Sequence, residues 1–325
     1  MRYIRLIYLS FCFSFWALWP ASAFAWGKPG HQLVCSVAET QLDATSRQWL
    51  KTTLALGEFL DGNGSDNFAD ACLWADVAKY SSHRDSYELH FINIPAGIET
   101  IDLARDCAAM DCLTVGIRRS LVYLSQDSHG KREDARKAAA LRYLGHLVGD
   151  LHQPLHVSHE EDWGGNKIKI TGFGAPTNLH SLWDVILVNQ AGLSYPASIN
   201  RLKPKGPRAP ATDSVQIMPW LQHSFELART TAYRHTNGQL IVSGDGLNAA
   251  YIARALPMVE GQLTSAAHHL ASLLTQVANG RLTVDTMDSL VFKPERAHDR
   301  DSIKFPHELP EPVASMEKSG PTTGP

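Results

Sequence analysis

The chain has 325 residues, 44% hydrophobic and 19% charged, with a formal net charge of −3 at pH 7. This is a globular composition, long enough for one large core or two small ones. The acidic balance excludes the broad basic surface of sequence-specific nucleic-acid binders. A site for phosphate esters would therefore take its positive charge largely from metal ions.

The first 25 residues are predicted to be a cleaved export signal. Arg2 and Arg5 precede a mostly apolar run over 6–19, and small residues at 21–25 suit signal peptidase. The alternative is a membrane anchor, but the run is short for a bilayer span and no later segment is apolar enough for one. We therefore expect a secreted or periplasmic protein, whose mature net charge falls from −3 to −5 with the loss of the two arginines.

Most of the mature chain has apolar residues at helical spacing, which predicts a mainly α fold in one domain over 26–285. Residues 166–171 alternate polar and apolar side chains, which favours a short β-hairpin. The basic stretch 201–210 is expected to be a solvated loop in preference to a nucleic-acid contact, and 286–325 a disordered tail. Helices are expected at 31–56, 66–80, 114–127, 133–151, 178–191, 217–235 and 246–279.

Four cysteines remain once the signal is removed, and an exported protein would use them in disulfides. Cys107 and Cys112 are close enough to close a small loop, which leaves Cys35 to pair with Cys72. The alternative is a zinc site built from all four thiolates, which the lack of a Cys-x-x-Cys pair argues against.

The segment 144–156 is the most informative part of the sequence, because it contains several potential metal ligands. It places His146 and Asp150 four residues apart, so both lie on one face of a helix and can bind the same metal ion. Pro154 cannot continue the helix and can direct His156 towards a second ion. Imidazoles and carboxylates are costly in an apolar segment unless they are paired or metal-bound. The segment therefore indicates a multinuclear zinc site with hydrolytic chemistry.

Further donors occur elsewhere in the chain. His180 and Asp184 repeat the four-residue spacing, and Asp76 and His90 lie in apolar stretches. Signal cleavage would make Trp26 the amino terminus, and a free α-amine with a pKa of about 8 deprotonates readily beside a metal. The amine and carbonyl of Trp26 could then chelate an ion, the alternative being that Trp26 merely packs.

These residues fall in motifs that resemble the zinc-dependent single-strand nucleases of the nuclease S1/nuclease P1 family. The motifs run from 26 to 184 in the family's order, and they imply a mostly helical fold related to the trinuclear-zinc phospholipases C. The motifs are Trp26-Gly-x-x-Gly-His31, Trp74-Ala-Asp76, His90-Phe91-Ile92, Gly145-His146-x3-Asp150-x-His-Gln-Pro-Leu-His156, Asp162-x-Gly-Gly-Asn166 and His180-Ser-Leu-Trp-Asp184.

The resemblance implies three zinc ions, with Asp150 bridging two of them. His152 lies among these ligands but matches a position that is not a ligand in the family, so we expect it to have a supporting or structural role. The implied ligands are Asp76, His90, His146 and Asp150 for the first ion, Trp26, His31 and Asp150 for the second, and His156, His180 and Asp184 for the third.

The resemblance also implies hydrolysis of unpaired DNA and RNA to 5′-phosphate products, with 3′-nucleotidase activity on mononucleotides. A base in a duplex is already paired and stacked, so it cannot lie on Phe91, the implied stacking residue. Asp76 and Asp150 would act in catalysis together with Lys79 near the scissile phosphate. Asn93 stands where fungal members commonly have Asp, which leaves base preference open.

Asn166 is carried over as a contact to phosphate or hydroxide, and no stable protein partner is implied. Two rival functions use the same metal ligands. A phospholipase C-like phosphodiesterase would need exposed apolar residues near the site, for which Phe91 and Trp163 are candidates. A zinc-binding protein without catalysis would have no need of an ordered Trp26 terminus or of Lys79.

Overall fold

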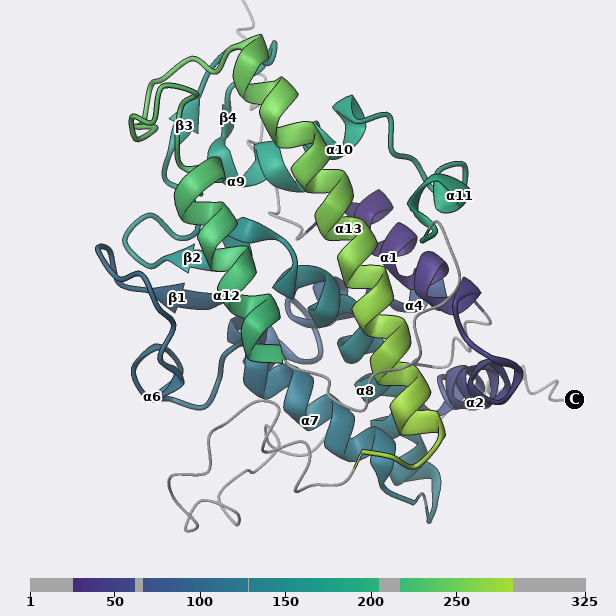
Figure 1. The fold of residues 1–325 in the computed structure, drawn as a ribbon. Coiled ribbons are helices and arrows are strands. Elements are labelled where there is room, and N and C mark those ends of the chain that lie inside the picture. Colours follow the sequence, from purple (N-terminus) through teal and green to yellow (C-terminus); the bar gives the residue numbers. More distant parts are fainter. Residues whose placement is uncertain (1–25, 62–66, 128, 205–216, 283–325) are drawn as a thin grey trace, which may run out of the picture.

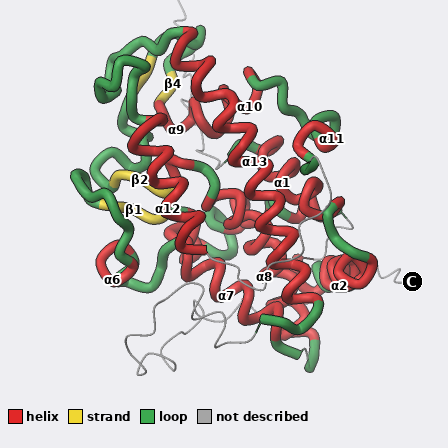
Figure 2. Tube along the Cα trace, in the orientation of Figure 1, coloured by secondary structure: helices red, strands yellow, loops and turns green. Residues whose placement is uncertain are grey.

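The computed structural model describes residues 26–61, 67–127, 129–204 and 217–282. It is mainly helical, as predicted, with two short strand pairs at one side (Figures 1 and 2). The predicted signal at 1–25, the predicted tail at 286–325 and most of the basic stretch 201–210 lie outside the described residues. The longer helices are α1 (Lys28–Thr40), α2 (Ala44–Ala55), α7 (Leu113–Ser125), α8 (Lys131–Leu151), α12 (Ile217–Leu227) and α13 (Ala249–Ala278).

Shorter helical elements occupy the connections between these helices. Several of them carry residues that the sequence marks as metal ligands, at or near their ends. They are α3 (Glu58–Asp61), α4 (Phe68–Ala71), α5 (Trp74–Ala78), η1 (Arg84–His90), α6 (Leu103–Asp106), η2 (Pro154–His156), α9 (Leu179–Ser181), η3 (Leu182–Ile186), α10 (Leu187–Gln190), α11 (Ile199–Leu202) and η4 (Ala228–Ala232).

Helix α8 is the central element and packs against α7, α1 and α13. Glu133 and Asp134 in its first turn suit the positive end of the helix dipole. Its second half is buried from Gly145 to Leu151, so polar side chains there must find partners inside the protein. The helix ends before Pro154, which lacks the N–H that another helical turn would need.

The helix predicted over 31–56 is two helices, α1 and α2. The Asp43 side chain accepts a hydrogen bond from the Ser46 backbone N–H at 2.8 Å and so caps the start of α2. Such a cap satisfies an amide that has no partner within the helix, and it favours a new helix over continuation of the previous one. The prediction over 66–80 was also too long, because α4 and α5 are separate.

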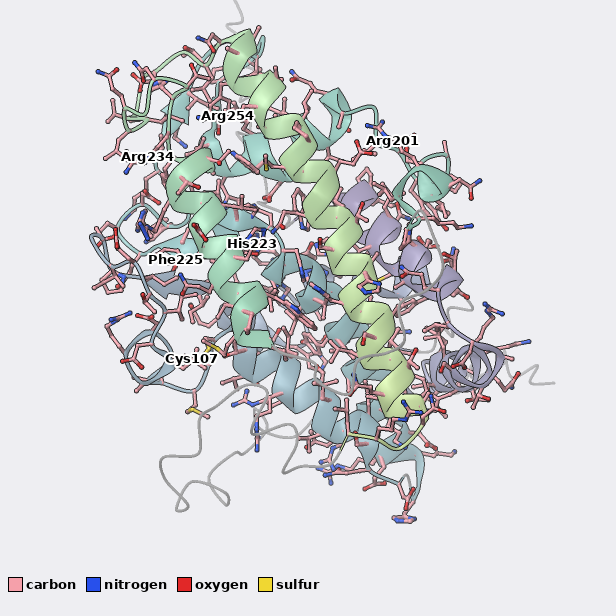
Figure 3. The ribbon with its side chains drawn as sticks, viewed as in Figure 1. Cys107, Arg201, His223, Phe225, Arg234 and Arg254 are labelled. Atoms are coloured by element: carbon pink, nitrogen blue, oxygen red, sulfur yellow. A yellow bond between two sulfur atoms is a disulfide. The ribbon has the colours of Figure 1, made fainter. Side chains whose placement is uncertain are left out.

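Helices α12 and α13 lie side by side over the core (Figure 1). Gln262 of α13 donates to the Ser224 hydroxyl of α12 at 3.1 Å. Arg254 of α13 donates to the Thr231 carbonyl of η4 at 3.1 Å. Phe225 of α12 is fully buried, and its ring meets that of His159 with 6.0 Å between centroids (Figure 3). The buried apolar side chains form one continuous core that extends from Trp26 to Leu282.

Two small sheets complete the fold. The hairpin predicted near 166–171 is present as β3 (Lys169–Ile170), which pairs with the antiparallel β4 (Thr177–Asn178). The parallel pair of β1 (Ile92–Ile94) and β2 (Val157–His159) was not predicted, because three-residue strands carry too little pattern to detect. This pair joins the segment after His90 to the segment after His156.

Both predicted disulfides form, Cys35 with Cys72 and Cys107 with Cys112, so the four-thiolate zinc site is excluded. Cys107 follows α6 at the edge of the molecule (Figure 3). The Cys35–Cys72 bond ties α1 to the end of α4, directly against Gly145 of α8. Among the described residues, no helix combines the length and apolar character that a bilayer span requires.

Gly145→Ala should destabilise the protein. A Cβ at this position would collide with Cys72 Sγ and lie 3.0 Å from Cys35 Sγ, and a disulfide cannot move aside. We expect overpacking of about 1–3 kcal/mol to outweigh the gain of about 1 kcal/mol in helix propensity. Denaturant titration of both proteins measures the difference in free energy of unfolding.

The matched control is Gly261→Ala in α13, where a Cβ would meet no atom within 4 Å. This variant should be more stable than the wild type by about 0.5–1 kcal/mol. A Gly145→Ala protein stabilised to the same extent as Gly261→Ala would contradict the packing of the disulfide on α8.

Candidate metal centre

Eight buried His and Asp side chains, each at most 6% exposed, converge around the end of α8. They come from α1, α5, η1, α8, η2, α9 and η3, and so from segments spread between residues 31 and 184 of the sequence. Within each of three groups, the possible ligand atoms lie within 4.8 Å of one another. The groups are His31, Asp76 and His146; His90, His146 and Asp150; and His156, His180 and Asp184.

The first two groups share His146, and Asp150 touches both of them. His146 Nε2 lies 3.4 Å from Asp76 Oδ1, 3.2 Å from Asp150 Oδ2 and 3.1 Å from His90 Nδ1. The other carboxylate oxygen, Asp150 Oδ1, lies 3.3 Å from His31 Nε2. Donor atoms that bind one tetrahedral zinc ion at about 2.0–2.1 Å are themselves about 3.3 Å apart. The spacing in these groups is therefore that of metal ligands.

The third group stands at the other end of the cluster. His180 Nε2 lies 3.1 Å from Asp184 Oδ2, and both residues face His156, whose ring centroid is 5.0 Å from that of His180. His180 and Asp184 are on α9 and on η3, the helical turn that follows it, so the four-residue spacing brings them together as the sequence predicted.

Backbone carbonyls fix the orientation of three of the rings. Nδ1 of His146 donates to the Cys72 carbonyl, Nδ1 of His156 to the His90 carbonyl, and Nδ1 of His180 to the Gly164 carbonyl, each at 2.7 Å. A ring nitrogen beside a carbonyl must carry the proton. Nε2 of each ring therefore points into its group, and in the neutral ring it is the unprotonated nitrogen, which can bind a cation.

Several buried polar atoms of the cluster lack a hydrogen bond. Buried polar atoms are normally paired, because leaving one unpaired costs about 1–3 kcal/mol. The unpaired atoms are both ring nitrogens of His31, Nε2 of His90 and His156, Oδ1 of Asp150 and Oδ2 of Asp184. Nε2 of His31 faces Oδ1 of Asp150 at 3.3 Å, and Oδ2 of Asp184 faces Nε2 of His180 at 3.1 Å. Such facing nitrogen and oxygen atoms fit the metal that the sequence implies.

The electrostatic potential of the cluster also favours a cation. Burial lowers the pKa of His146, but Asp150 and Asp76 outweigh it and raise this pKa to about 10. Burial likewise lowers the pKa of Lys79, which Asp76 and then Asp150 raise overall. Lys79 is 5% exposed, and its Nζ lies 2.6 Å from Asp76 Oδ1. The two buried carboxylates thus favour positive charge on His146 and Lys79.

Trp26 is fully buried beside this cluster. Its indole Nε1 donates to the Gly149 carbonyl at 2.8 Å, and the next backbone amide, of Gly27, donates to the Asp184 carbonyl at 2.7 Å. A Cβ on Gly149 would lie 2.8 Å from His31 Nδ1, so this glycine leaves room for the ring. The main chain of Trp26 is therefore held between α8 and η3.

The three residues predicted to contact substrate lie at the margin of the cluster and are partly exposed. Phe91 directly follows His90, and its ring meets that of Tyr87 edge-on with 5.8 Å between centroids. Asn93 is the middle residue of β1. The amide of Asn166 donates to the Trp163 carbonyl at 2.9 Å, so it also stabilises its own turn.

The sequence did not identify the groups that orient the ligands. Gln153 is fully buried, and its amide donates to Asp184 Oδ1 while its oxygen accepts from the Leu155 amide. Gln153 lies within the quoted motif but was given no role. The carbonyls that accept hydrogen bonds from the rings belong to the backbone, so no residue type in the sequence indicates them.

His152 faces away from the three groups, which agrees with a structural role. Its Nδ1 donates to the Val148 carbonyl, and its Nε2 lies 2.8 Å from Nδ1 of His269. The Trp220 ring stacks on His269 with 3.8 Å between centroids. Burial, followed by the repulsion of His152, lowers the pKa of His269 to about 2.

The chain is similar to known proteins over most of its length. The S1/P1 Nuclease family model matches residues 26–279. Endonuclease 3 of Arabidopsis thaliana is 29% identical over 278 residues, which cover 80% of this chain and 91% of the relative. Nuclease S1 of Aspergillus oryzae is 26% identical over 280 residues, covering 79% and 93%. Nuclease P1 of Penicillium citrinum is 33% identical over 168 residues, covering 50% and 58%.

His269→Gln should weaken the dependence of stability on pH. His269 stays neutral in the folded protein down to about pH 2, whereas in the unfolded chain it binds a proton below about pH 6.5. Stability is therefore lost as pH falls through 6.5, by up to about 1.4 kcal/mol per pH unit for one histidine. Unfolding free energies measured from pH 7 to 4, with the same metal supplied to both proteins, should fall less steeply in the variant. Parallel curves would contradict the burial of neutral His269.

Proposed function

The chain belongs to the S1/P1 nuclease family, and on that basis we propose that it is an exported, zinc-dependent endonuclease of single-stranded DNA and RNA. Its products would carry 5′-phosphates, and it would also hydrolyse 3′-mononucleotides. The observation that carries this proposal is the set of three buried His and Asp groups, in which several nitrogen and oxygen atoms have no hydrogen-bond partner. The two disulfides support export, because they persist in oxidising compartments.

Nitrogen and oxygen donors at this spacing suit zinc. We assign three ions to these residues, with Asp150 shared between two of them. When bound, zinc supplies Lewis acidity to a phosphoryl oxygen and to the attacking water. The proposed ligands are Asp76, His90, His146 and Asp150 for the first ion, Trp26, His31 and Asp150 for the second, and His156, His180 and Asp184 for the third.

The other residues would bind and orient the substrate. Lys79 is held by Asp76, so its ammonium group is in place to pair with the scissile phosphate before any substrate arrives. Phe91 would stack on a base, with Tyr87 supporting its ring from the side. A base that is already paired cannot reach this ring, which explains the proposed preference for single strands. Asn166 would contact phosphate from the turn that it stabilises.

The amino terminus completes the proposal. Processing before Trp26 would free an amine at a point that is already anchored by the bonds from Trp26 to Gly149 and from Gly27 to Asp184. That amine and the Trp26 carbonyl would bind together with His31. Correct processing would thus be a condition for full metal loading.

Asp150→Asn is the variant that tests the function. Purified protein should cut single-stranded DNA and RNA, leave duplex DNA and phosphatidylcholine largely intact, and give 5′-phosphate ends. The variant should lose more than one metal ion per chain, because its carboxylate faces His146 on one side and His31 on the other. Its activity should fall by more than about 100-fold, beyond the usual loss for residues that only support a ligand.

Asp111→Asn, which changes an exposed carboxylate, serves as the control and should keep wild-type metal and activity. Hydrolysis of phosphatidylcholine in preference to DNA would favour the phospholipase alternative. Full metal content without cleavage of any phosphodiester would favour a zinc-binding protein.

A short Gly-Ser extension before Trp26 should lower activity by about 10–100-fold, because the extended chain has no free amine at this position. Metal analysis should show one ion fewer than in the processed chain. Both forms can be prepared from one precursor by cleavage at two engineered positions. Equal activity and metal content in the two forms would remove the amino terminus from the site.

A further inference from the structure

Trp163 is an exposed indole in an unusual position. At 64% exposed, it is the most exposed large apolar side chain in the described part of the chain. Folding gives no reason for this, since burial of such a side chain is favourable. Its backbone has φ of 55°, a left-handed conformation that bulky residues rarely adopt. An exposed aromatic side chain on a backbone in an unfavourable conformation indicates a role other than stabilising the fold.

The surrounding turn holds Trp163 firmly in place. Its amide donates to the Glu160 carbonyl at 3.1 Å, and its carbonyl accepts from both nitrogens of Asn166 at 3.2 and 2.9 Å. Asp162 Oδ1 accepts from the Gly165 amide at 2.6 Å and from the Tyr233 hydroxyl at 2.7 Å. The indole is thus presented by a rigid turn and needs little further ordering when it binds.

This turn is joined to the third His and Asp group. The carbonyl of Gly164, the residue after Trp163, accepts the proton of His180 Nδ1 at 2.7 Å. Phe91 follows His90 of the second group, so each of these two aromatic residues is linked to a histidine of a different group. A strand bound at both groups would come close to both residues.

A cation lies against the indole. Lys167 Nζ is 4.1 Å from the ring centroid and is also held by the Glu161 carbonyl at 3.0 Å. A stacking ring beside a fixed ammonium group is the combination that binds single-stranded nucleic acid without reading its sequence. A membrane surface would require more than one exposed apolar residue at this turn.

We propose that Trp163 is a second base-stacking platform, which receives the nucleotide on the 3′ side of the scissile phosphate, with Lys167 beside its backbone. This inference rests on the proposed nuclease function and extends it from one gripped nucleotide to two. A 3′-mononucleotide has no base on this side, whereas a dinucleotide does. Trp163 would therefore distinguish polymer cleavage from mononucleotide hydrolysis.

Kinetics of Trp163→Ala on two substrates test the proposal. The ratio of KM for adenylyl-(3′→5′)-adenosine to KM for adenosine 3′-monophosphate should rise by about 5- to 100-fold, the loss expected for one stacked base. The kcat for the dinucleotide should change less than KM, because the ring binds substrate and does not touch the reacting atoms. Trp163→Phe keeps a ring and should restore most of the ratio. Leu240→Ala, at a side chain 58% exposed, is the matched control and should leave the ratio as in the wild type.

A binding measurement separates this proposal from the proposed function. A fluorescein-labelled phosphorothioate oligothymidylate should bind Trp163→Ala more weakly than wild type, by the same factor, in fluorescence anisotropy. If wild-type protein cleaves nothing, the proposed function fails, and anisotropy still decides whether Trp163 binds a strand. An unchanged KM ratio with unchanged anisotropy overturns the proposal. So does a variant that loses affinity only for phosphatidylcholine vesicles, because the ring would then serve a lipid surface.

Discussion

The structure depends on the burial of two carboxylates, Asp76 and Asp150, in the middle of a helical core. Neither is more than 4% exposed, and an isolated buried carboxylate is strongly unfavourable unless cations or hydrogen-bond donors balance it. The protein surrounds this pair with imidazoles and Lys79, and the negative potential raises the pKa of His146 to about 10 despite burial. The same charge balance that permits the fold makes the cluster a place where divalent cations are favoured.

The topology follows from the need to bring these ligands to one helix. Helix α8 supplies His146 and Asp150 from its buried half, and the parallel pair of β1 and β2 sets the chain after His90 beside the chain after His156. The disulfide between Cys35 and Cys72 fixes the helix that carries His31, and the carbonyl of Cys72 holds the ring of His146. One covalent link therefore both closes the core and orients a ligand.

The sequence predicted most of the fold, because long helices such as α8 and α13 carry a strong apolar pattern. Two features were not predicted from the sequence. One is that the Asp43 cap starts a new helix, and the other is the strand β1, which is only three residues long. The spacing of His146 and Asp150 predicted that the two residues share one face of α8, and the structure brings their donor atoms within 3.2 Å. The backbone carbonyls that orient the rings could not be predicted, because tertiary contacts and not residue type decide which carbonyl lies beside each ring.

The most direct test is anomalous X-ray scattering at the zinc absorption edge, from crystals of the protein processed at Trp26. The account predicts three peaks inside the buried groups, two of them within bonding distance of Asp150 and the third beside His180. Absence of peaks at these groups in active protein, or an experimental map in which Asp150 and His31 lie far apart, would contradict it.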